Sequence, residues 1–166
     1  MREKTCCFTG HRDIPKSEIG LVMKRTEEYV KALVQRGVKF FGVGGALGYD
    51  ALAAKLLFRL RASELPGIKV ILVYPFDGYM DRWTIRQRAD ALLMKPKYDK
   101  IVKVSDEPGR DAYLQRDRHL VDGSAFCICY CTRRDGGTAY TVRYALSKGL
   151  KVFNTADFDV ARLGRQ

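Results

Sequence analysis

The chain has 166 residues, 46% of them hydrophobic, and this length fits a single domain with its own hydrophobic core. Its 30 lysines and arginines outnumber its 19 aspartates and glutamates, and the formal net charge of +11 favours anionic partners such as nucleotides or nucleic acid. The apolar runs are too short for a membrane span and the N-terminal residues lack the pattern of a secretory signal, so we expect a cytoplasmic protein without a membrane span.

Strands and helices are predicted to alternate along the chain. Apolar residues recur at helical spacing at Ile19, Val22, Val30 and Leu33, whereas residues 68–74 form an apolar run typical of a strand buried on both faces. In chain order we expect a strand at 5–9, a helix at 17–36, a strand at 38–43, a helix at 49–62, a strand at 68–74, a loop and basic helix at 76–94, a strand at 100–104, a helix at 112–122, a strand at 125–130, a helix at 138–148 and a strand at 151–154.

This alternation predicts an α/β domain whose mostly parallel sheet is covered on both faces, which makes a three-layer αβα sandwich. We expect this single domain to cover residues 1–156, followed by a short, weakly structured tail at 157–166. In such a sheet, ligands bind at the carboxyl ends of the strands, where the strand order reverses.

Two glycine turns, GGALGYD at 44–50 and DGGTAY at 135–140, each follow a predicted strand and open a predicted helix. Glycine lets the backbone approach a ligand closely, and the free N–H groups and dipole of a helix N-terminus favour an anion. A third polar turn, TGHR, follows the first predicted strand. We therefore expect one crevice lined by Gly10, Gly45 and Gly137, with a nucleotide-like ligand.

Several residues near these turns allow two interpretations. Asp50 either caps its helix or holds a ribose hydroxyl, and Thr138 either caps the following helix or binds phosphate. His11 acts either as a general acid or base, or through a hydrogen bond that binds a ligand or supports the structure. Trp83 stacks on a base or closes the core, and Arg12 and Arg116 hold phosphate or belong to a solvated basic face.

The five cysteines are predicted to be buried and reduced. Cys127, Cys129 and Cys131 alternate along one strand, so their thiols share one face, which is poor geometry for a tetrahedral metal. We expect no metal site.

Together, CCFTGHR at 6–12, GGALGYD, the tryptophan after the third predicted strand, RDRHLVD at 116–122 and GGT at 136–138 resemble the YpsA-like family of the SMF/DprA–LOG (SLOG) superfamily. The resemblance runs from about Cys6 to Asn154. It implies a Rossmann-like sheet and a nucleotide-derived ligand, with contacts from Thr9, Gly10, His11, Arg12, Gly44, Gly45, Ala46, Gly48, Asp50, Arg116, Gly136, Gly137 and Thr138, to which Trp83 is added as a candidate.

The first hypothesis is a module that senses or sequesters a nucleotide or a nucleotide derivative. ADP-ribose, NAD or a nucleoside phosphate are the candidate ligands, with no fixed cofactor. The second is a LOG-like phosphoribohydrolase or N-glycosidase that uses His11 or Asp50 as a catalytic residue. The LOG motif P-G-G-x-G-T-x-x-E has no matching glutamate here, because Tyr140, Thr141 and Val142 follow the glycines, and this argues against hydrolysis. The third is a DprA-like single-stranded DNA binder. Weak nucleic-acid binding and a homo-oligomer are further partner hypotheses.

Overall fold

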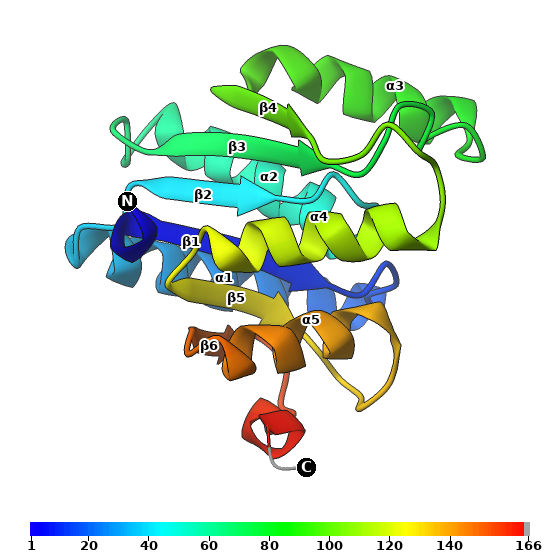
Figure 1. Cartoon of the computed structure of the whole chain (residues 1–166). Helices are drawn as coiled ribbons and strands as arrows, with labels where there is room; N and C mark the ends of the chain where they lie inside the picture. The colour runs from blue at the N-terminus through cyan, green and yellow to red at the C-terminus, as the bar shows by residue number, and fades with distance from the viewer. Residues whose placement is uncertain (165–166) are drawn as a thin grey trace.

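A six-stranded, fully parallel sheet forms the centre of the computed structural model, which describes residues 1–164 (Figure 1). The strands lie in the order β4-β3-β2-β1-β5-β6. Their bounds are β1 Thr5–Gly10, β2 Phe40–Val43, β3 Lys69–Tyr74, β4 Lys100–Lys103, β5 Phe126–Tyr130 and β6 Lys151–Asn154. The predicted Rossmann-like α/β fold with a parallel sheet is confirmed.

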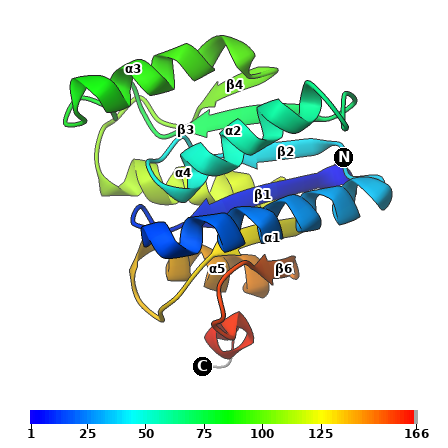
Figure 2. The ribbon, with the colours of Figure 1, turned by 180° about the vertical axis from the view of Figure 1, so that it is seen from behind.

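Five α-helices cover the two faces of this sheet. Figure 1 shows α4 and α5 in front of it, and Figure 2, turned by 180°, shows α1, α2 and α3 on the other face. Right-handed crossovers between parallel strands dictate these sides. The helices are α1 Lys16–Gln35, α2 Tyr49–Arg61, α3 Ile85–Met94, α4 Arg110–Asp122 and α5 Gly136–Ser147. No helix within residues 1–164 is long and apolar enough to cross a membrane.

The core lies in two layers, one on each side of the sheet. On the α1 and α2 side, Phe8 and Phe41 pack with Tyr49 and with the buried stripe of α1. On the α4 and α5 side lie Cys7 and the three alternating cysteines of β5 and its exit, together with Val121 and Val142. All five cysteines are buried and free, as the sequence predicted.

The C-terminal segment differs from the prediction. Val160–Gly164 forms a short 3₁₀ helix, and Leu163 is buried against the α5 side of the core. The expectation of a weakly structured tail is therefore wrong for these residues, because Leu163 docks the segment together with the partly buried Phe158 and Val160. The last two predicted tail residues, 165–166, lie outside the described residues.

The strand order reverses between β1 and β5. The chain steps from β1 outward through β2 and β3 to β4, and then α4 crosses back over the sheet to place β5 on the other side of β1. The carboxyl ends of β1 and β5 therefore flank the switch point of the sheet. Open parallel sheets leave a crevice at such a point, because the loops after the two strands turn away to opposite faces.

Candidate functional site

A crevice of about 620 Å³ opens at this switch point. Four segments form it: the turn after β1, the glycine turn between β2 and α2 with the start of α2, the inner face of α4, and the first turn of α5. The residues that the sequence predicted and that line it are Thr9, Gly10, His11, Arg12, Ala46, Asp50, Arg116, Gly136, Gly137 and Thr138. The structure thus brings most of the predicted site together.

The first turn of α5 offers backbone donors to this crevice. Asp135 precedes the helix but makes no capping hydrogen bond with its side chain. Gly136 adopts a positive φ of 91°, and a Cβ atom on Gly137 would meet nothing within 4 Å. Since the first N–H groups of a helix have no partner inside it, the N-terminus of α5 is open to an anion.

Four arginines line the crevice: Arg12, Arg110, Arg116 and Arg133. Only Arg116 is buried, and its position is fixed by the protein itself. Its Nη1 donates to the carbonyl oxygen of Gly44 at 2.6 Å and its Nε to Asp117 Oδ1 at 2.7 Å. Arg116 therefore ties α4 to the glycine turn after β2. The other three arginines are exposed, and Arg133 lies 3.5 Å from Asp135 Oδ1 in an exposed ion pair.

The glycine turn after β2 is closed by its own carboxylate. Asp50 lies in the first turn of α2, and its Oδ2 accepts hydrogen bonds from the N–H groups of Gly44 at 3.1 Å and Ala46 at 3.4 Å. A carboxylate already stands where the sequence placed a phosphate. These two donors are consequently not available to a ligand, so the open α5 terminus is the better anion site.

Burial raises the pKa of Asp50 to about 6, although the Arg116 guanidinium counteracts part of that rise. The second oxygen, Oδ1, is buried and has no hydrogen-bond partner among the described residues. An unsatisfied buried carboxylate oxygen is costly, so it invites a donor from outside the protein.

Gly10 and Gly48 allow the turn after β1 to contact the start of α2. A Cβ on Gly10 would lie 2.5 Å from the Tyr49 ring, and one on Gly48 would lie 2.2 Å from the carbonyl oxygen of Arg12. Gly48 also has a positive φ of 80°. These glycines hold the turn after β1 against the start of α2, where Tyr49 donates its N–H to the His11 carbonyl at 3.1 Å.

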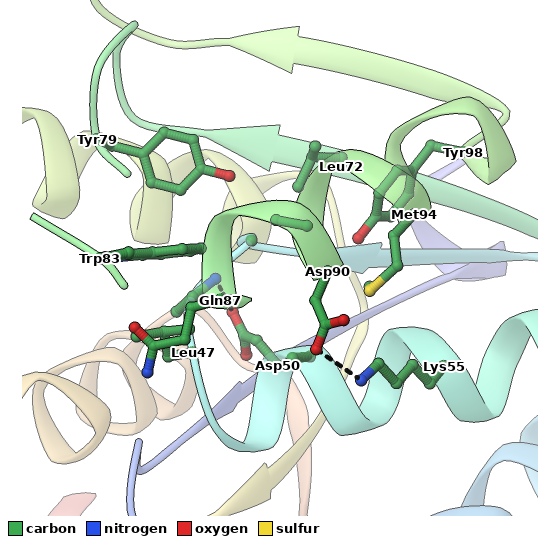
Figure 3. A pocket seen from close by; sticks show the side chains of 14 residues that line it. Leu47, Asp50, Lys55, Leu72, Tyr79, Trp83, Gln87, Asp90, Met94 and Tyr98 are labelled. Atoms are coloured by element: carbon green, nitrogen blue, oxygen red, sulfur yellow. Dashed lines mark hydrogen bonds and ion pairs between the residues drawn. The ribbon is translucent and has the colours of Figure 1, made fainter. Parts of the chain in front are cut away.

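Four of the predicted site residues do not line the crevice: Gly44, Gly45, Gly48 and Trp83. Gly45 and Trp83 face a second hollow between α2 and α3, where Trp83 and Tyr79 pack edge to face with ring centres 5.4 Å apart (Figure 3). The expectation that Gly45 shares one crevice with Gly10 and Gly137 is therefore wrong. The chain leaves β2 with Gly45 at a φ of 71°, and a Cβ atom at this position would lie 2.8 Å from the Tyr79 hydroxyl oxygen.

His11 is engaged in a structural hydrogen bond. Its Nε2 accepts from the N–H of Thr132 at 2.9 Å, and the ring edge meets Tyr130 with centres 5.5 Å apart. Burial and the nearby Arg133 lower the pKa of His11, which favours the neutral ring that this acceptor role requires. The nitrogen that would act as a base is thus already occupied.

Sequence reasoning missed Tyr113 and Asp117 of α4 as crevice residues. They lie at helical spacing with Arg110 and Arg116, so one face of α4 carries arginine, tyrosine and aspartate toward the crevice. The Arg116 guanidinium sits over the Tyr113 ring at 5.6 Å from its centre. The helical spacing of the polar residues in this segment, which is independent of its apolar stripe, is the signal that identifies them.

Comparison with known proteins identifies the family. The YspA SLOG family (YpsA) matches residues 7–159 of this chain. The chain belongs to that family.

Bacterial relatives of this SLOG chain are UPF0398 proteins. That of Oceanobacillus iheyensis is 22% identical over 149 residues, which are 87% of this chain and 80% of the relative. That of Staphylococcus saprophyticus is 26% identical over 93 residues, which are 52% of this chain and 49% of the relative. The match thus spans about half the length of the latter.

Two solved structures of DNA processing protein A share the fold of this SLOG chain. The Streptococcus pneumoniae protein has a TM-score of 0.66 at 17% identity, covering 94% of this chain and 52% of the other. The Helicobacter pylori protein, whose structure concerns a single-stranded DNA binding mode, has a TM-score of 0.64 at 16% identity, covering 92% and 65%. At such low identity the likeness shows the fold alone.

Proposed function

We propose that this chain binds a nucleotide or a nucleotide derivative, such as ADP-ribose, NAD or a nucleoside phosphate, and that the switch-point crevice holds its phosphate. The observation that carries the proposal is the open N-terminus of α5 facing three exposed arginines in one crevice. Backbone N–H groups and guanidinium forks are complementary to phosphate oxygens, and the helix dipole adds to the attraction. We assign no reaction to the site.

The geometry of His11 supports binding over catalysis by that residue. Its Nε2 accepts a backbone N–H group, so the side chain holds a loop in place. Asp50 likewise holds its loop through Oδ2, while its Oδ1 has no partner among the described residues. A catalytic base needs a free atom within hydrogen-bond reach of the proton that it removes. A sensing or sequestering module needs only the binding surface.

Calorimetric titration with ADP-ribose, NAD, AMP and ADP tests the proposal. Arg12→Ala removes a charge-assisted hydrogen bond worth about 1.5–3 kcal/mol, so the affinity should fall by roughly 10- to 150-fold. Gly137→Glu places a carboxylate at the open helix N-terminus and should abolish binding.

Matched variants keep this test specific. Gly137→Ala adds only a methyl group in open space and should bind normally, and Arg86→Ala removes an exposed arginine of α3 outside the crevice. Unchanged affinity in both Arg12→Ala and Gly137→Glu, or no binding of any of the four nucleotides to the wild type, would refute the crevice as a phosphate site.

Single-stranded DNA is the second candidate partner. It is favoured by the fold shared with the Helicobacter pylori protein and by the net charge of +11. A strand of DNA offers many phosphates, whereas a nucleotide offers one to three, so the two candidates differ in their response to salt.

A further inference from the structure

A second hollow lies beside the crevice, on the α2 and α3 side of the glycine turn. We call it the aromatic hollow, lined by Leu72, Tyr79, Trp83, Met94, Tyr98 and Asp50. Figure 3 shows Trp83 and Tyr79 on one side, Met94 and Tyr98 on the other, and Asp50 between them. It offers about 90 Å³ to the centres of water molecules, against roughly 10–15 Å³ for one water site. There is room for several non-hydrogen atoms.

The charges of the aromatic hollow oppose those of the crevice. Its charged groups are Asp50, Asp90 and Lys55, and Lys55 is paired with Asp90 at 3.8 Å (Figure 3). The hollow is therefore unsuited to phosphate. Its apolar and aromatic walls suit a flat, uncharged ring, since rings stack on or pack edge-on against aromatic side chains.

One polar atom at the hollow lacks a partner. Asp50 is only 6% exposed, and its Oδ1 accepts no hydrogen bond within the described part of the chain. Oδ2 takes both backbone N–H groups, so Oδ1 is left as an acceptor. Asp50 and Ala46 line both cavities, so the Asp50 side chain lies where the two adjoin, with Oδ1 just beneath the surface.

We propose that the aromatic hollow binds a purine base and that Asp50 Oδ1 accepts a hydrogen bond from an N–H group of that base. The inference rests on the proposed function, in that the base belongs to the nucleotide whose phosphate occupies the crevice. Binding would satisfy this buried carboxylate oxygen, which has no partner among the described residues, so bases without an N–H donor are disfavoured. Asp50 thus serves the site twice, by closing the glycine turn and by reading the base.

The fluorescence of Trp83 reports on this hollow directly, because it is the only tryptophan in the chain. Adenosine, guanosine and purine riboside, which lacks the N–H donors of the other two bases, are titrated against the wild type. We expect adenosine or guanosine to quench Trp83 and to bind at least about ten-fold more tightly than purine riboside, the lower bound for a hydrogen bond to a charged group.

Asp50→Asn inverts the polarity of the contact. Its amide oxygen still accepts from Gly44 and Ala46, while its NH₂ group takes the place of Oδ1. The preference over purine riboside should fall to about one, whereas Asp106→Asn, at an exposed carboxylate that lines neither cavity, should preserve it. Equal binding of all three nucleosides to the wild type, no quenching by any of them, or a preference that survives Asp50→Asn would overturn the proposal.

The two proposals fail separately. If Gly137→Glu abolishes nucleotide binding but the nucleosides show no preference, the phosphate site stands and the base site falls. If the nucleosides show the preference but a phosphate adds no affinity, the base site stands and the phosphate site falls.

Discussion

Asp50 decides how the glycine turn after β2 works. A glycine turn at a helix N-terminus predicts free N–H groups, and the sequence predicts that Asp50 caps its own helix or holds a ribose hydroxyl. In the structure, the N–H groups of Gly44 and Ala46 donate to the carboxylate of Asp50, which lies in the first turn of α2. A side chain six residues beyond the first glycine thus replaces the anion for which this kind of turn is known. The α5 turn has no such carboxylate inside it and remains open.

The raised pKa of Asp50 predicts a pH dependence of stability. Its folded pKa of about 6 exceeds the ordinary 3.8, so the folded protein binds this proton more tightly than the unfolded chain does. The stabilisation is fully present below about pH 3.8 and is lost as the pH rises through 6, on the order of 3 kcal/mol in total. Asparagine cannot ionise, so the Asp50→Asn variant should not lose stability in this way as the pH rises.

Urea unfolding of both proteins between pH 4 and pH 8 measures the effect. The free energy of unfolding of the wild type, minus that of Asp50→Asn, should fall as the pH rises through about 6. Taking the difference cancels the contributions of the other titrating groups to the free energy of unfolding. Only the effects of Arg116 and Asp117 on the pKa of Asp50 remain in it. A difference that stays flat or rises with pH would mean that Asp50 is ionised throughout the range.

At the scale of elements, the turn after β1 and the start of α2 form one unit. Gly10 and Gly48 are the positions at which a Cβ atom would strike the opposing element, and the His11–Tyr49 backbone hydrogen bond joins the two. This contact positions Arg12 at the crevice. Stability and ligand binding should therefore respond together to its disruption.

Two glycine-to-alanine substitutions test this unit. Gly48→Ala forces a Cβ to within 2.2 Å of the Arg12 carbonyl oxygen at a positive φ, and it should cost at least about 2 kcal/mol and weaken nucleotide binding. Gly20→Ala, in the exposed face of α1 with nothing within 4 Å, should stabilise by about 0.5–1 kcal/mol. Chemical denaturation compares them, and equal effects would show that the contact is not tight.

The elements were largely predictable because their signals are local. The helical stripe of α1 and the apolar run of β3 lie where the sequence placed them, and the alternation gave the parallel sheet. The sequence could not predict which cavity each turn would face. Whether Gly45 faces the crevice or the aromatic hollow depends on how Tyr79, distant in the chain, packs over it. Docking of Leu163 is likewise a tertiary contact without a local signature.

At the scale of the whole molecule, the positive charge lies at both ends of the sheet. Arginines gather at the carboxyl ends of the strands, around the crevice. At the opposite edge, exposed lysines precede or begin five of the six strands, and we call them the amino-edge lysines: Lys4, Lys39, Lys69, Lys100 and Lys151. Backbone hydrogen bonds from Lys39 to Lys4 and from Lys69 to Lys39 place three of them side by side.

This separation predicts how single-stranded DNA binds. The amino-edge lysines offer a track of charge that contacts phosphates and not base edges, so binding should be sequence-independent and no tighter than about micromolar at physiological salt. Because the track lies away from the crevice, saturating nucleotide should displace only part of the DNA. The salt slope should approach −0.7 for each phosphate contacted.

Fluorescence anisotropy with a labelled oligothymidylate, at about 50 to 200 mM salt, measures this binding. The double variant Lys39→Gln/Lys69→Gln should flatten the salt slope while leaving nucleotide affinity unchanged, because both side chains lie at the edge away from the crevice. Arg12→Ala should do the reverse, lowering nucleotide affinity with little effect on the slope. A tight complex that survives 200 mM salt, is fully displaced by nucleotide and is lost on Trp83→Ala would instead make single-stranded DNA the ligand of the crevice and the aromatic hollow together.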